Sequence, residues 1–271
     1  MTQPLDTFLA ENPHAVLIEI TGTQGSTPRE AGTFMLVSAD HIWGTIGGGQ
    51  FEYLAIGNAR DILKGSGTEF MDIPLGPEIG QCCGGRTQLR CRLATPDVIS
   101  VLTRRLRDES EDWPDVYLFG AGHVGRALAI ALKPLPLATT VIETRQEELN
   151  ELPADINTRL VAMPEALISD VPAGAAVVIL THDHALDFLI AQRALARTDF
   201  AYVGMIGSAT KRATFASWLA REGGDKASLD RLTLPIGGAA VKDKRPEVIA
   251  AMTAAELLTA FAAYSIRLSS Q

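Results

Sequence analysis

The chain has few cysteines, no excess of basic residues and no long apolar run, and each absence excludes a class of protein. Three cysteines in 271 residues, an odd count, do not suggest the disulfide framework of a small secreted domain. The formal net charge of -8 argues against a broad nucleic-acid surface, because such binding depends on neutralising phosphates. We therefore expect no nucleic-acid partner.

Signals for secretion and membrane insertion are also missing. The first residues, MTQPLDTFLAENPH, lack the basic and apolar regions of a secretory signal. The most apolar stretch, AAVVIL at 175–180, is too short to span a bilayer. The sequence predicts a cytoplasmic protein with no membrane partner.

The first half of the chain has the pattern of a mixed α+β domain. Its expected strands are short and bounded by turn residues, and they cover residues 15–21, 33–38, 41–45, 68–75 and 86–94. The turn-rich segment 22–32 is expected to be a loop. The charged stretch ESEDWP, 109–114, indicates a linker, so the expected domains are 1–109 and 110–271.

The second half alternates strands with helices. Its expected strands cover residues 115–120, 138–144, 175–181 and 201–207. The all-apolar strand at 175–181 is typical of a parallel sheet covered on both faces. This alternation predicts an α/β fold in which the N-terminal α+β domain precedes a Rossmann-like, doubly wound domain.

A glycine fingerprint, GAGHVG at 120–125, follows a predicted strand and opens a predicted helix. Gly120 permits the tight turn, Gly122 lets the backbone approach a pyrophosphate, and Gly125 lets helix and strand pack closely. Glu143 follows at the end of the next strand, where an acid can meet a ribose hydroxyl. His123 is either a ligand contact or a solvent-facing filler. The loop fits NAD(P), another phosphorylated ligand, or close packing alone.

The segment THDH, 181–184, follows the most apolar strand and therefore lies at the carboxyl edge of the sheet. His182, Asp183 and His184 could bind a metal, although two histidines two residues apart are a weak signal. The alternative is an ordinary polar loop in which Asp183 caps the next helix.

The third motif is GQCCGGR at 80–86, with vicinal Cys82 and Cys83. A thiolate is a nucleophile and a soft metal ligand, and Arg86 would favour the thiolate form. Vicinal cysteines seldom chelate one metal together, and no C-x-x-C is present for a thiol redox enzyme. Cys91 lies on a predicted strand and is expected to fill the core. The cysteines could also be small residues in a tight turn.

Six segments occur in an order that resembles the XdhC/CoxI family of xanthine dehydrogenase accessory proteins. They are GTQGSTPREAGTFML (22–36), GTIGGGQFE (44–52), GQCCGGR (80–86), LFGAGHVGRAL (118–128), MIGSATKR (205–212) and RPEVIAA (245–251). The chain departs from the family pattern at Gly238 and Asp243, where leucine and glycine are expected.

The resemblance implies a chaperone of the molybdenum cofactor (molybdopterin) rather than an enzyme in its own right. Such proteins hold the cofactor while a cysteine desulfurase supplies sulfur, and then deliver it to the molybdenum-binding subunit of xanthine dehydrogenase. The resemblance places the family's functional cysteine at Cys83, which could contact molybdenum through the cofactor, with Cys82 as an extra thiol. It also implies a homodimer.

The expected cofactor-binding residues follow from the three glycine motifs. They are Gln81, Cys82, Cys83, Gly84, Gly85, Arg86, Gly47, Gly48, Gly49, Gly120, Gly122, His123, Gly125 and Glu143. The alternative function is an NAD(P)-dependent oxidoreductase that uses the GxGxxG loop. No Tyr-x-x-x-Lys pair or other evident acid–base pair accompanies that loop.

Overall fold

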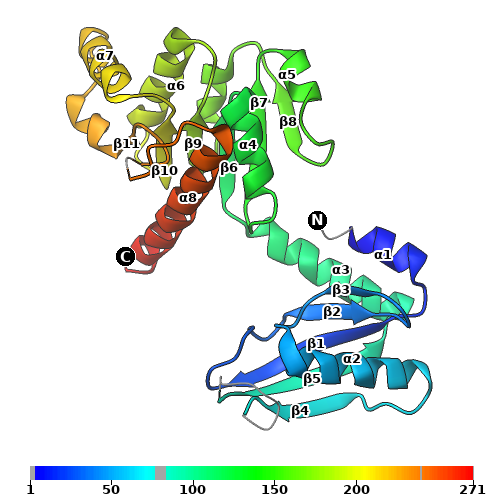
Figure 1. Ribbon diagram of the computed structural model, residues 1–271. Coiled ribbons are helices and arrows are strands. Elements are labelled where there is room, and N and C mark those ends of the chain that lie inside the picture. The colour runs from blue at the N-terminus through cyan, green and yellow to red at the C-terminus, as the bar shows by residue number, and fades with distance from the viewer. Residues whose placement is uncertain (1–3, 77–83, 239, 271) are drawn as a thin grey trace. The chain divides into compact units, whose positions relative to one another are not determined.

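The computed structural model describes residues 4–76, 84–238 and 240–270. Its elements form two compact units, Met1–Arg107 and Asp108–Gln271, each built around its own sheet (Figure 1). The expected boundary after Glu109 falls inside helix α3 (Pro96–Glu111), because that helix continues into the charged stretch that we expected to be a linker.

The first unit is a five-stranded antiparallel sheet with helices on both faces (Figure 1). Its elements before α3 are α1 (Leu5–Glu11), β1 (Val16–Gln24), β2 (Phe34–Val37), β3 (Ile42–Gly44), α2 (Gly49–Leu63), β4 (Phe70–Pro74) and β5 (Arg86–Leu93). The strand order is β3-β2-β1-β5-β4, so β1 is central.

The central strand β1 is apolar on both faces because helices cover both. Val16 and Ile18 pack with Phe51 of α2, whereas Leu17 packs with Phe8 of α1 and the buried part of α3. On β5, the expected inward face is buried from Thr87 to Cys91, but Leu93 at the strand end is 51% exposed. Cys91 fills the core, as predicted.

Strand β1 is longer than the sequence predicted. We expected a loop over 22–32, but Gly22, Thr23 and Gln24 continue the ladder opposite Gln88, Thr87 and Arg86 of β5. The register shifts between Ile20 and Gly22. A bulge of this kind bends a strand without ending its pairing, which a count of turn residues does not predict.

The second unit is a parallel sheet of six strands in the order β11-β10-β9-β6-β7-β8. Its elements are β6 (Asp115–Phe119), α4 (His123–Leu132), β7 (Ala138–Glu143), α5 (Gln146–Asn150), β8 (Asn157–Leu160), the 3₁₀ helix η2 (Pro164–Ser169), β9 (Ala176–Ile179), α6 (His184–Ala196), β10 (Tyr202–Met205), α7 (Ala209–Arg221), η3 (Lys226–Arg231), β11 (Leu232–Thr233) and α8 (Pro246–Ser269). This is the Rossmann strand order, so the predicted fold class is confirmed.

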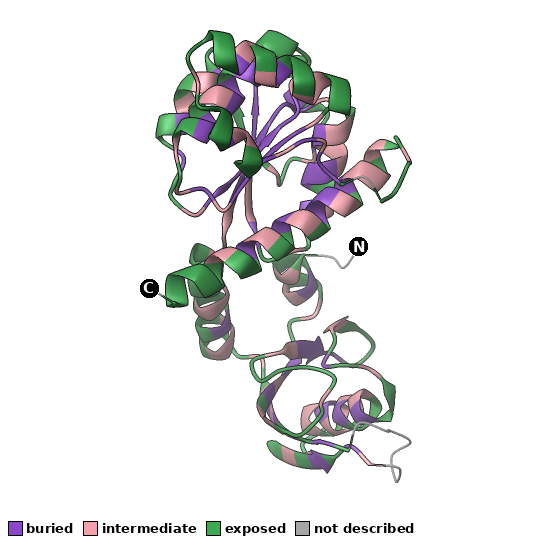
Figure 2. Ribbon diagram, turned by 90° about the vertical axis from the view of Figure 1, so that its left-hand side faces the viewer, coloured by how far each residue is buried: buried purple, intermediate pink, exposed green. Residues whose placement is uncertain are grey.

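Two apolar cores lie on opposite faces of this sheet. One joins α4 and α8 to the sheet, and the other joins α6 and α7 to it. Strand β9 is buried along its whole length, and Figure 2 shows the strands in purple between helices whose outer faces are green. The order of strands reverses between β6 and β9, so a crevice for a ligand is expected outside their carboxyl ends.

Helix α8 is the longest helix of the second unit. By length and composition alone it could cross a membrane. In this structure one face of it is buried, and Leu257 and Phe261 pack into the same core as Leu128 of α4. Its apolar character therefore has an explanation in the packing of a core helix.

Neighbouring leucines on α8 test this packing. Leu257→Ala should lower the free energy of unfolding by about 2–5 kcal/mol, because Leu257 is fully buried and its loss leaves a cavity. Leu258, which is 41% exposed, serves as the control, and Leu258→Ala should change that free energy by less than about 0.5 kcal/mol. Urea unfolding measures both, and equal effects would contradict the assigned face.

Candidate functional site

Two of the glycine motifs meet in the first unit. Ser26 and Gly84 form an isolated parallel bridge, and a Cβ at Gly85 would lie 2.1 Å from the carbonyl oxygen of Ser26. Gly25 also lies against this segment, since a Cβ there would lie 3.4 Å from the Cα of Gly85. The G-T-Q-G-S-T-P-R segment therefore contacts the backbone that directly follows the cysteines.

The triple-glycine loop reaches the same segment. A Cβ at Gly47 would lie 2.8 Å from Cγ of Pro28, so only glycine fits against that ring. Residues 25–29, 45–49 and 84–86 thus converge on one part of the first unit, which we call the glycine corner. Three stretches that are far apart in the sequence come together there.

Glu52 holds the triple-glycine loop in place. Its Oε2 accepts hydrogen bonds from the amides of Ile46 (3.0 Å) and Gly48 (3.1 Å) and from the hydroxyl of Thr45 (2.5 Å). We did not single out Glu52 from the sequence. The available signal was an acid four residues after Gly48 in the first turn of a helix, where a carboxylate reaches back to free amides.

The glycine corner leaves part of its backbone open. An added Cβ at Gly48 or Gly84 would meet nothing within 4 Å, and both residues have positive φ values, of 77° and 68°. Exposed backbone without side chains suits the close approach of a flat ligand. Arg29 is exposed at the same corner, and no ion pair to its guanidinium occurs within the described ranges.

The structure describes only part of the expected thiol site. Gln81, Cys82 and Cys83 lie outside the described residues. Arg86, which we expected to favour a thiolate, donates from Nε to Oδ1 of Asp72 at 2.6 Å, across the β4–β5 ladder. This pairing lowers the pKa of Asp72, and it leaves the guanidinium already matched by a carboxylate.

In the second unit, the fingerprint glycines have the geometry of a Rossmann turn. A Cβ at Gly120 would lie 2.4 Å from the carbonyl oxygen of Leu180, and one at Gly125 would lie 2.1 Å from that of Gly120. Gly122 faces open space, where a Cβ would meet nothing within 4 Å. His123 is exposed as the first residue of α4.

Glu143 is buried and bound to this loop. Its Oε2 accepts from the amide of Ala121 at 3.0 Å, and its Oε1 accepts from the amide of Thr144 at 2.8 Å. The guanidinium of Arg145 lies 3.3 Å from the carboxylate. Burial alone would raise the pKa of Glu143, but these donors outweigh burial and lower it.

The enclosed space beside Glu143 is small. The cavity between Glu143, Thr144, Pro164, Thr181 and His182 has a volume of about 10 Å³. That is the room of about one water molecule. A ribose hydroxyl would have to compete with the amides of Ala121 and Thr144 for the carboxylate.

The T-H-D-H segment is a helix-capping loop. Asp183 is the N-cap of α6, and its Oδ1 accepts from the amide of Ala185 at 2.7 Å, as one of our two interpretations predicted. His182 and His184 are exposed. Over 4–76, 84–238 and 240–270, no three potential metal ligands cluster.

A buried ion pair supports the same edge of the sheet. Asp187 is fully buried. Its carboxylate accepts hydrogen bonds from Nζ of Lys211 at 2.5 Å and from the hydroxyl of Thr181 at 2.7 Å. Lys211 also donates to the carbonyl of Ile206 at 2.8 Å. The ends of β9 and β10 are tied together in this way. We missed this pair because its members are 24 residues apart and only the fold brings them together.

Fold and site define a two-unit α/β protein with one glycine-lined corner and one Rossmann loop. Residues 8–73 match the family model described as the XdhC and CoxI family, and residues 116–257 match the one described as the XdhC Rossmann domain. The second match alone covers more than half of the chain. The chain belongs to the XdhC and CoxI family.

Two individual proteins extend this comparison. The chain is 30% identical over 262 residues to the protein YqeB of Escherichia coli (strain K12). The aligned region covers 92% of this chain and 44% of YqeB. The chain thus spans less than half the length of that relative. The crystal structure of a xanthine dehydrogenase from Bacillus halodurans is similar at a TM-score of 0.73 and 17% identity, over 96% of this chain and 95% of that one. This second likeness shows the fold.

The hydrogen bonds to the Glu143 carboxylate predict that the free energy of unfolding depends on pH. A carboxyl with a lowered pKa in the folded state stabilises it above the ordinary value of 4.5, and this contribution disappears as the pH falls through the folded pKa. Glu143→Gln should lower the free energy of unfolding by about 1–3 kcal/mol at pH 7, because an amide places a donor against donors. The difference from wild type should shrink below pH 4.5.

Unfolding in urea between pH 3 and 7 measures this difference. Glu147→Gln on the neighbouring helix is the control, because Glu147 is exposed. A difference between wild type and Glu143→Gln that stays constant with pH would show that the Glu143 carboxylate does not carry the effect.

Proposed function

We propose that this protein binds the molybdenum cofactor as cargo, holds it during sulfuration and delivers it to the molybdenum-binding subunit of xanthine dehydrogenase. Membership of the XdhC and CoxI family suggests an accessory role for xanthine dehydrogenase. The cargo, its sulfuration and its delivery go beyond that membership and rest on the chemistry of the glycine corner.

The observation that carries the proposal is the bridge between Ser26 and Gly84. Gly84 directly follows Cys83 in the sequence, so the backbone after the thiol is held against the G-S-T-P-R segment. A flat pterin with a phosphate suits the open backbone at Gly48 and Gly84 and the exposed guanidinium of Arg29. A thiolate is a suitable soft ligand for the metal that the cargo carries.

Within this proposal each group has a limited task. The amides and Arg29 bind and orient the cargo, and Cys83 contacts the molybdenum or the sulfur on it, with Cys82 as an additional thiol. A cysteine desulfurase supplies the sulfur and the xanthine dehydrogenase subunit receives the product. The protein acts as a homodimer. The net negative charge of the chain does not prevent binding of an anionic cargo, because recognition of an anion by amides and one cation is local.

Three cysteine variants test the thiol. Cys83→Ala, purified from a host that makes the cofactor, should contain at least about tenfold less molybdenum per chain than wild type, a loss of about 1.4 kcal/mol or more in binding. Cys91→Ala is the matched control, because Cys91 is buried in the core, where burial raises the pKa of its thiol. Elemental analysis gives the molybdenum, and fluorescence of the oxidised pterin gives the organic part.

The Cys82→Ala variant identifies which thiol acts. It should retain the cargo, and retention by Cys83→Ala with loss in Cys82→Ala would move the role to Cys82. Equal molybdenum and pterin in wild type and all three variants would remove the thiols from the proposal.

The alternative, an NAD(P)-dependent oxidoreductase, is tested at the Rossmann loop. Titration with NADH should show no stoichiometric energy transfer from tryptophan, because the Glu143 carboxylate that would meet a ribose hydroxyl already accepts from the amides of Ala121 and Thr144. Gly122→Val is the informative variant, since a Cβ at Gly122 meets nothing within 4 Å and the variant should fold. Tight binding of NADH that Gly122→Val abolishes would instead support the oxidoreductase.

A further inference from the structure

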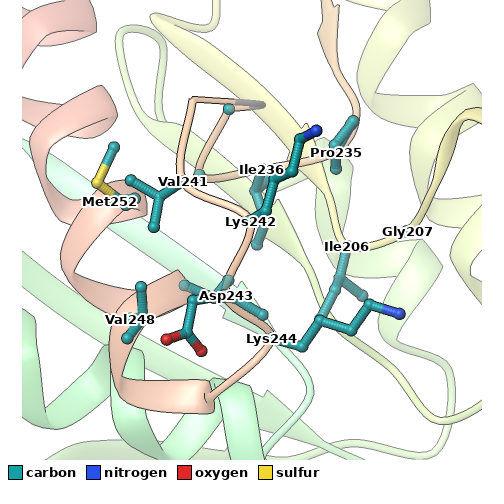
Figure 3. A pocket seen from close by; sticks show the side chains of 13 residues that line it. Ile206, Gly207, Pro235, Ile236, Val241, Lys242, Asp243, Lys244, Val248 and Met252 are labelled. Carbon is teal, nitrogen blue, oxygen red and sulfur yellow. The ribbon is translucent and has the colours of Figure 1, made fainter.

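A larger cavity lies elsewhere in the second unit, away from the cysteines and from the residues around Glu143. It has a volume of about 370 Å³ and lies between the end of β10, the loop after β11 and the first turns of α8 (Figure 3). Its walls are mainly apolar, and they are formed by Ile206, Ile236, Val241, Val248 and Met252. Small-molecule sites combine such walls with a few polar groups, at volumes of about 300–1,000 Å³.

The polar groups at this cavity leave a positive charge. Asp243 is paired with Arg245, whose Nη2 lies 2.7 Å from Oδ2, and this contact lowers the pKa of Asp243. Lys242 and Lys244 also line the cavity, and no ion pair to either ammonium group occurs within the ranges that the structure describes. Figure 3 shows both lysine side chains extending to one side of the loop and Asp243 to the other.

Hydrogen bonds hold Gly237, one of the residues that line the cavity, in place. Glu256 of α8 accepts from the amide of Gly237 at 2.9 Å and from the hydroxyl of Tyr202 at 2.8 Å. Burial and the neighbouring Glu256 carboxylate both raise the pKa of Tyr202, so its hydroxyl remains a donor. Gly237, in the loop after β11, is therefore bound through Glu256 to α8 and Tyr202 of β10, which reduces the cost of ordering this part of the cavity on binding.

Two residues of the loop after β11 keep one side of the cavity free of further side-chain atoms and free charge. Gly238 and Asp243, where the resemblance led us to expect leucine and glycine, both line it. Glycine at 238, with a φ of 68°, adds no side chain to the cavity, and Asp243 binds Arg245 instead of leaving that guanidinium free.

We propose that this cavity binds a heterocyclic monophosphate, with the ring between the apolar walls and the phosphate at Lys242 and Lys244. A nucleoside monophosphate and a pterin phosphate share this chemistry. The volume lies near the lower end of the range for ligand sites, which suits one ring and one phosphate rather than a dinucleotide. The proposal does not require the thiol role of Cys83, because none of its residues belongs to the first unit.

Calorimetric titration of the full chain tests the site with four probes: GMP, neopterin monophosphate, guanosine and inorganic phosphate. At least one of the two heterocyclic phosphates should bind once per chain, at least about tenfold more tightly than guanosine or inorganic phosphate, because ring and phosphate contribute together. The double variant Lys242→Gln/Lys244→Gln should weaken that binding at least about tenfold. Lys226→Gln is the control, because Lys226 is exposed in the same unit and does not line the cavity.

The outcomes separate this site from the proposed function. Binding that is lost in the double variant but kept in Cys83→Ala supports the cavity whatever the result for molybdenum. A preference for neopterin monophosphate over GMP assigns the cavity to a pterin, and the reverse preference assigns it to a nucleotide. If neither phosphate binds, or if the double variant binds as tightly as wild type, the proposal is wrong.

Discussion

Each unit contains segments whose backbones pack so closely that only glycine fits between them. A Cβ at Gly85 would lie 2.1 Å from the carbonyl oxygen of Ser26, and one at Gly125 would lie 2.1 Å from that of Gly120. Atoms this close cannot be accommodated by small shifts, so any other residue would separate the segments. The glycine corner and the Rossmann turn exist because these positions carry no side chain.

Such close contacts leave loop amides in need of acceptors, and buried or partly buried carboxylates supply them. Glu52 binds the triple-glycine loop, Glu143 binds the amide of Ala121, Asp187 binds that of Thr181, and Glu256 binds that of Gly237. Each of these carboxylates already accepts at least one hydrogen bond from a loop amide, so its acceptor capacity is used within the protein. These acids therefore position loops.

Much of the second unit could be predicted from the sequence, because its signals are local. The alternation of strands and helices, the G-x-G-x-x-G turn and the cap at Asp183 all depend on residues within a few positions of one another. The strand order of the first unit, the extension of β1 to Gln24 and the pairing of Asp187 with Lys211 were not predicted. Each depends on which distant segments meet, and local periodicity does not encode that.

Charge shows the same division between local and global properties. The chain carries a net charge of -8, yet that number says little about a single cavity, since free charges are screened over about 8 Å at physiological ionic strength. What matters is which cations remain unpaired. Arg86, Arg145 and Arg245 are each matched by a carboxylate, whereas Lys242 and Lys244 at the cavity and Arg29 at the glycine corner have no such partner among the described residues. An anion gains most where a cation has not already been neutralised, so the local pairing of cations bears more on phosphate binding than the total charge does.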